Sequence, residues 1–158
     1  MGIPLLARAL TAFLVLPAIV GFVIPLWLLS SGDARRSFHV IGILPLAVGT
    51  ALLLWCVRDF YVVGKGTLAP WDPPRRLVVV GLYRWSRNPM YVAVSLVLLG
   101  WAMAFRARPH IVYALVMMTV FYFRVVLFEE PWLARTHGEA WHRYQARVPR
   151  WLSVKGPQ

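Results

Sequence analysis

Four long apolar segments constrain this 158-residue chain more than any other feature of its sequence. They are Ala9–Leu29, Phe38–Val57, Pro89–Phe105 and Ile111–Phe128. Soluble domains are about half apolar and a quarter charged, whereas hydrophobic residues here make up 59% of the chain and charged residues 15%. We therefore predict an all-α, polytopic membrane protein with about four transmembrane helices and further cytoplasmic helices in the C-terminal tail. The length suits a single domain over residues 1–158.

The predicted spans have two irregular features. At about 1.5 Å per residue the last two reach only ~25–27 Å, which is near the lower limit for crossing a bilayer. The first two contain Pro17, Pro25 and Pro45. A proline inside a helix leaves a backbone carbonyl without its donor, and membrane helices tolerate this where a neighbour satisfies that carbonyl.

The cations fall mainly on one side of the predicted spans. Twelve Lys and Arg residues lie on the side that holds both termini and four on the other, with Arg124 inside the fourth span. The positive-inside rule therefore predicts cytoplasmic termini. The formal charge of +11 belongs to a chain rich in Trp and Tyr, and so indicates anionic lipid headgroups as partners and no nucleic acid. The lone Cys56 and four scattered histidines predict neither a disulfide nor a metal site.

The third segment begins with the sequence RNPMY, residues 87–91. Asn88 suits the N-cap of a helix and Pro89 its first position, while Arg87 and Tyr91 suit the membrane interface. The same helix start, beside Arg84 and Arg87, presents free N–H groups and positive charge to an anion such as a carboxylate. Local physics leaves both interpretations open.

Glu129 and Glu130 adjoin the end of the fourth predicted span, where a helix C-terminus disfavours negative charge. One explanation is pairing with Arg124 or with arginines of the tail. The other is a receptor for a bound ammonium or sulfonium group, and the residues alone do not decide between them. Arg124 is either a functional intramembrane residue or a side chain that extends to the nearby interface. Pro131 suits the first turn of a new helix.

The tail is expected to form two helices, divided at Gly138. Glu139 and Arg143 have the i,i+4 spacing of an exposed ion pair. Trp141 and Tyr144 suit the headgroup level of a bilayer.

Two stretches together resemble a known family: GLYRWSRNPMY at 81–91 and, after the next span, EEPWLARTHGEAWHRYQARVPRW at 129–151. Their order and spacing are similar to those of the isoprenylcysteine carboxyl methyltransferase and phospholipid methyltransferase superfamily, over roughly Gly64–Trp151. The resemblance implies an integral-membrane methyltransferase of the short, bacterial inner-membrane type. It also implies that S-adenosylmethionine binds in a cytoplasmic pocket covered by the tail. The implied cofactor contacts are Arg75, Arg76, Leu77, Val78, Tyr83, Arg87, Asn88, Pro89, Met90, Tyr91, Glu129 and Glu130.

Carried onto this chain, the family pattern assigns the arginines and the helix start to the methionyl carboxylate, and a glutamate to the methionyl ammonium. The catalytic roles would fall to Glu129, Arg124 and Glu130. A carboxylate acceptor needs only a cation, such as Arg124 or Arg147. An amine acceptor must be neutral, which would require Glu129 or Glu130 to take its proton.

Two positions depart from the family pattern. Asn88 stands where the family has histidine, and Val125 stands where the eukaryotic carboxyl methyltransferases have a substrate-binding arginine. The expected acceptor is a lipophilic molecule, with a prenyl or fatty carboxylate and a phospholipid amine both open. Two other functions also stay open: a membrane reductase of the sterol-reductase type that uses NADPH, and a non-enzymatic lipid-binding protein.

Overall fold

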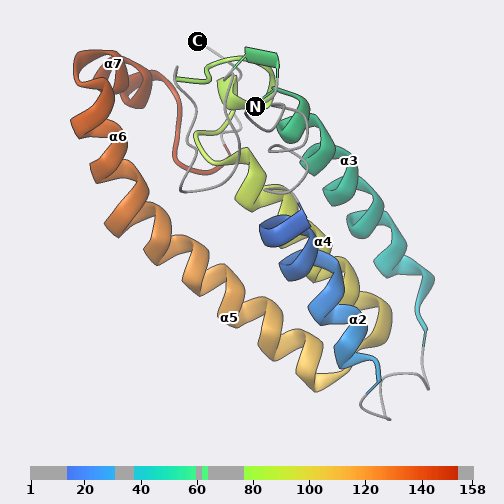
Figure 1. The fold of residues 1–158 in the computed structure, drawn as a ribbon. Helices are drawn as coiled ribbons and strands as arrows, with labels where there is room; N and C mark the ends of the chain where they lie inside the picture. Colours follow the sequence, from blue (N-terminus) through green and yellow to red (C-terminus); the bar gives the residue numbers. More distant parts are fainter. Residues whose placement is uncertain (1–13, 31–37, 60–61, 64–76, 153–158) are drawn as a thin grey trace, which may run out of the picture.

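The computed structural model describes residues 14–30, 38–59, 62–63 and 77–152. These residues form helices and connecting segments, with no strand among them (Figure 1), so the all-helical prediction is confirmed for this part of the chain. In chain order the elements are η1 (Leu14–Val23), α2 (Ile24–Leu28), η3 (Val40–Gly42), α3 (Ile43–Asp59), η5 (Gly81–Arg84), α4 (Pro89–Phe105), α5 (Arg108–Arg124), η6 (Val125–Glu129), α6 (Glu130–His137) and α7 (Glu139–Arg147). Of these, η1 and η6 are π-helical, and η3 and η5 are 3-10 helices.

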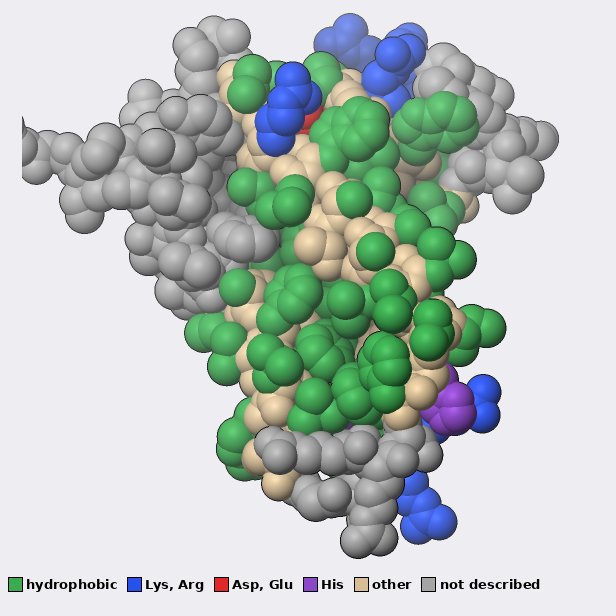
Figure 2. All heavy atoms as spheres, turned by 90° about the vertical axis from the view of Figure 1, so that its right-hand side faces the viewer, with side chains coloured by type: hydrophobic (Ala, Val, Ile, Leu, Met, Phe, Trp, Pro, Cys, Tyr) green, Lys and Arg blue, Asp and Glu red, His purple; other side chains and the backbone are tan. Residues whose placement is uncertain are grey.

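In the described part of the chain, two continuous helices are long and apolar enough to cross a bilayer: Val40–Asp59 and Arg108–His137. In their most apolar stretches only 22% and 17% of the residues are buried, so most of these apolar side chains face outward. Figure 2 shows hydrophobic side chains over the middle of one face and Lys and Arg side chains toward its two ends, as in a protein surrounded by lipid. The described parts of the other two predicted spans form shorter apolar helices, Pro17–Leu28 and Pro89–Phe105. For them, a membrane crossing stays a prediction.

Helices α3 and α4 pack against each other through glycine. A Cβ atom added at Gly49 would lie 2.7 Å from the carbonyl oxygen of Ala93, and one added at Gly100 would lie 2.6 Å from the backbone nitrogen of Leu46. No side chain fits at these distances, so the two backbones approach closely, as they do at small residues in membrane helix pairs. The buried core beside this contact consists of Leu53, Ala93, Val94, Leu98, Ala114 and Phe121.

Side chains of neighbouring helices satisfy the backbone carbonyls in the turn before Pro25 of α2. Proline has no N–H to donate to the turn before it. The indole Nε1 of Trp101 donates to the carbonyl of Gly21 (3.0 Å), and the Tyr113 hydroxyl donates to the carbonyl of Val20 (3.0 Å). The donors come from α4 and α5, so the same bonds that satisfy the proline-broken helix also hold it against its neighbours.

The predicted helix end at the two glutamates is wrong. Arg108–His137 is one continuous helix, in which the π-helical turn η6 joins α5 to α6, and Pro131 lies just after that turn. Glu129 and Glu130 therefore lie inside a helix and not at a C-terminus that would repel them. The predicted division at Gly138 is confirmed: its φ of +50° ends α6, and α7 folds back from that point (Figure 1).

Candidate functional site

The start of α4 is held in place by the chain that follows α7. Pro89 occupies the first turn and Asn88 the N-cap position, as predicted, but the Asn88 side chain does not cap the helix. Its Nδ2 donates instead to the carbonyl of Arg150 (3.0 Å), and Ser86 Oγ accepts from the Asn88 N–H (3.0 Å). The backbone N–H of Arg87 donates to the carbonyl of Pro149 (2.9 Å). The helix start is thereby fixed to residues about 60 positions later in the chain.

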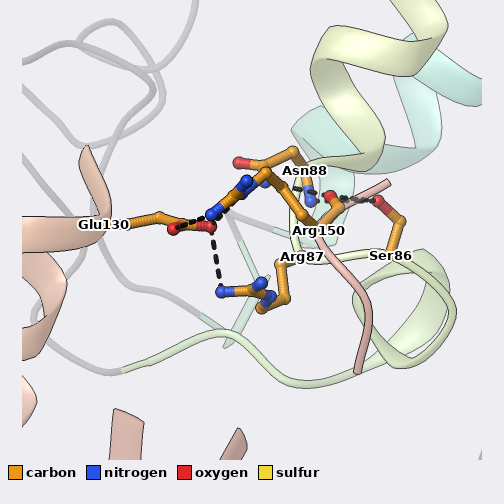
Figure 3. Close-up of polar contacts among 5 residues, drawn as sticks. All are labelled: Ser86, Arg87, Asn88, Glu130 and Arg150. Atoms are coloured by element: carbon orange, nitrogen blue, oxygen red, sulfur yellow. Dashed lines mark hydrogen bonds and ion pairs between the residues drawn. The ribbon is translucent and has the colours of Figure 1, made fainter. Parts of the chain in front are cut away.

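Glu130 lies between two arginines in this region (Figure 3). Arg150 binds it with two parallel hydrogen bonds, Nε to Oε1 and Nη2 to Oε2, each 2.8 Å long, and Arg87 Nη1 lies 2.9 Å from Oε1. The side chains of Arg87 and Glu130 are only 7% and 11% exposed, so this pair is largely desolvated. We call Ser86, Arg87, Asn88, Glu130 and Arg150 the clasp, because it joins the starts of α4 and α6 to the chain after α7.

The two arginines of the clasp differ in their surroundings. Burial lowers the pKa of the Arg87 guanidinium, while the neighbouring Glu130 opposes this shift. The hydrogen bonds to Glu130 raise the pKa of Arg150. Arginine nevertheless stays charged at neutral pH, so the clasp holds one carboxylate between two cations.

Glu129 has different partners from its neighbour. Its Oε1 accepts hydrogen bonds from the Tyr91 hydroxyl and, at 3.2 Å, from Arg124 Nε. In an α-helix, residues five apart point in directions about 140° different, but the wider π-helical turn η6 brings Arg124 and Glu129 to the same side. The second oxygen, Oε2, has no partner in the described part of the chain, and the side chain is 31% exposed.

The structure separates the two glutamates that the sequence left equivalent. Glu130 has both oxygens bound by arginine, which agrees with the interpretation as an ion pair with the tail. Glu129 pairs with Arg124, as that interpretation also allows, yet keeps one oxygen available. The other oxygen, Oε1, accepts from Tyr91 in the first turns of α4, so the RNPMY helix start and a glutamate are brought together.

The other predicted cofactor residues fall into two groups. Val78 and Tyr83 are buried with Cys56, and Met90 packs against this cluster. Leu77 packs instead against the cluster of Trp141, Tyr144 and Val148. The two groups are linked by a hydrogen bond of 2.7 Å from the Tyr144 hydroxyl to the carbonyl of Tyr83. Arg75 and Arg76 lie outside the described residues.

Trp141 and Tyr144, which suit the headgroup level by sequence, are buried inside the protein and do not present their side chains to a membrane surface. Their exposed fractions are 2% and 9%, and the guanidinium carbon of Arg87 lies 5.4 Å from the centre of the Trp141 ring. This cation–π contact lets α7 cover the Arg87 side of the clasp. Burial raises the pKa of the Tyr144 phenol, so its hydroxyl stays a donor.

Sequence reasoning missed Ser86 and Arg150 as parts of the site. Both lie within the quoted motifs: Ser86 precedes RNPMY, and Arg150 follows the Arg-Val-Pro segment at 147–149. Among the described residues, no group of three or more His, Cys, Asp or Glu side chains is placed to hold a metal ion.

Comparison with known proteins gives one match. A model of the family described as phospholipid methyltransferase matches residues 37–140, a range that includes RNPMY and both glutamates and ends before Arg150. No curated protein and no solved structure matches the chain. Because the family match covers more than half of the sequence, the chain belongs to the phospholipid methyltransferase family, membrane methyltransferases that act on lipids.

Proposed function

We propose that the chain transfers a methyl group from S-adenosylmethionine, bound between the start of α4 and Glu129, to a lipophilic acceptor at the cytoplasmic face of a bacterial inner membrane. The observation that carries this proposal is the position of Glu129. Its Oε1 is held by Tyr91 and Arg124, and its Oε2 is left available beside the RNPMY helix start.

The residues present fit such a cofactor. Its ammonium needs a carboxylate, which Glu129 Oε2 offers, whereas Glu130 is already saturated by arginine. Its carboxylate needs donors, and the first-turn N–H groups of α4 have no intrahelical partner. Arg87 Nε adds a buried donor without a hydrogen-bond partner in the described chain. The apolar side chains of Val78 and Met90, packed together, suit the adenine.

When bound, the cofactor supplies an electrophilic sulfonium methyl, so the protein mainly has to align donor and acceptor. An amine acceptor has to lose a proton to Glu129 or Glu130, and Glu129 is the better candidate because arginines already bind both oxygens of Glu130. A carboxylate acceptor needs a cation instead, which the half-exposed Arg124 would provide. Val125 stands at the family's arginine position, but its side chain is apolar and fully buried, so it cannot supply this cation.

Calorimetry on the detergent-solubilised chain tests the proposal. S-adenosylhomocysteine should bind saturably. Glu129→Gln should lower the affinity for this ligand about tenfold or more, because a hydrogen bond to a charged group contributes about 1.5–3 kcal/mol. Glu139→Gln removes the same charge from an exposed position on α7 and should leave the affinity unchanged.

Two results would contradict the proposal. Binding of NADPH without binding of S-adenosylhomocysteine would indicate the reductase, and binding of neither would indicate a lipid-binding protein. A positive result is followed by transfer of labelled methyl into a total membrane lipid extract. The labelled product then shows whether the acceptor is an amine or a carboxylate.

A further inference from the structure

A cavity of about 480 Å³ lies between the segment before α4 and helix α7. Half of its lining is apolar, and three of the remaining residues are arginines. The lining residues are Leu77, Val79, Arg84, Ala140, Arg143, Tyr144, Arg147 and Val148. No acidic residue is among them. Tyr144 contributes its ring, because its hydroxyl is already bound to the carbonyl of Tyr83.

The three arginines approach the cavity from two elements. Arg143 and Arg147 are four residues apart on α7 and therefore share one face of that helix, and Arg84 ends the 3-10 helix η5. All three are exposed, and none forms an ion pair or a side-chain hydrogen bond with the described part of the chain. The predicted pair between Glu139 and Arg143 does not form, so that prediction is wrong, and Arg143 has no counter-ion among the described residues. The paired arginines of the described chain are Arg58, Arg87, Arg124 and Arg150.

Three unpaired guanidinium groups around one cavity repel each other unless an anion lies between them. Arginine favours phosphate and carboxylate because its planar fork matches their oxygens. The cavity also has an apolar part of its lining, which suits a ligand whose anionic group is attached to an apolar body. The apolar residues are Leu77, Val79, Ala140 and Val148. The segment before α4 and helix α7 lie at the same end of the molecule (Figure 1), and both line the cavity.

We infer that this cavity binds a phosphate group, supplied either by the headgroup of an anionic lipid or by free phosphate. The site is separate from the proposed methyl-donor site. Among the described residues predicted to touch the cofactor, Leu77 lines the cavity, while Glu129, Tyr91 and Met90 do not. The inference therefore does not depend on the proposed function.

The test measures binding to the full chain in a neutral detergent, with inorganic phosphate and with short-chain phosphatidylglycerol as separate probes. Arg143→Gln and Arg147→Gln should each weaken binding about tenfold or more, the usual effect of losing one charge-assisted hydrogen bond. Arg135→Gln is the matched control: it removes the same charge from an exposed position on α6 that does not line the cavity, and should change the affinity less than twofold. Arg84→Gln, in η5 and not in α7, should also weaken binding about tenfold or more.

The two probes distinguish the sources of phosphate. If phosphatidylglycerol binds at least tenfold more tightly than inorganic phosphate, the ligand is a lipid headgroup. If the two bind equally, the phosphate group alone is recognised, and both results support the site. The inference is overturned if neither probe saturates, or if Arg135→Gln weakens binding as much as Arg143→Gln. It is also overturned if Arg143→Gln weakens S-adenosylhomocysteine and phosphate alike, because the cavity would then belong to the methyl-donor site.

Discussion

Replacing Glu130 by Gln should destabilise the protein far more than the same change at Glu129. Glu130 neutralises Arg87, whose side chain is only 7% exposed and cannot recover its hydration by moving to the surface. Removing one partner of a buried ion pair costs about 3–5 kcal/mol, because the other charge stays buried. The amide of Gln still accepts one hydrogen bond, which favours the lower half of that range. Glu129 is 31% exposed and Arg124 44%, so breaking their pair should cost about 0–1 kcal/mol.

Thermal unfolding of the detergent-solubilised chain measures this difference. For a chain of about 150 residues a loss of 1 kcal/mol lowers Tm by roughly 2–4 °C, so Glu130→Gln should lower it by roughly 6–16 °C and Glu129→Gln by at most about 4 °C. The double variant with Arg87→Met removes both buried charges and should recover part of the loss. Equal shifts for the two glutamate variants, or a further loss in the double variant, would show that the clasp does not stabilise the fold as reasoned.

Two further predictions concern the helix pair and the cysteine. Gly100→Ala should destabilise the protein by about 1–3 kcal/mol, because the new methyl would lie 2.6 Å from the Leu46 nitrogen. Gly138→Ala meets no atom within 4 Å, so thermal unfolding should show a smaller loss, due to its positive φ alone. Cys56 is fully buried and should react with a maleimide only after denaturation, as mass spectrometry would show. Rapid labelling of the native chain would contradict the packing of α3 against η5.

Hydropathy and local sequence predicted much of the fold. The third predicted span and α4 have the same bounds, Pro89–Phe105, because Asn-Pro at its start and the polar turn at its end are local signals. The helix break expected before Pro131 does not occur. The π-helical turn η6 joins α5 to α6, and Pro131 follows this turn within the same continuous helix. Whether a helix inserts such a turn depends on what its side chains meet afterwards, and this is not visible in the local sequence.

The candidate site was only partly predictable for the same reason. Motif order brought RNPMY and the glutamates together, and the hydrogen bond from Tyr91 to Glu129 confirms that they meet. The sequence could not distinguish Glu129 from Glu130, because the difference comes from Arg150, which lies 20 residues further along and reaches back to only one of them. Likewise, Trp141 resembled an interface anchor until Arg87 was found against its ring.

The π-helical geometry of η6 also determines which partner each of the two glutamates meets. If Val125–Glu129 formed a regular α-helical turn with the same number of residues, the helix would no longer absorb the extra residue that the π-helical turn takes up. Everything after it would rotate by about 100° relative to α5. Glu129 would leave Arg124 and Glu130 would leave the clasp, although every charged side chain would still be present. The one extra residue held in the π-helical turn therefore directs Glu129 to Arg124 and Glu130 to the clasp. A comparison of side chains position by position would not reveal this effect.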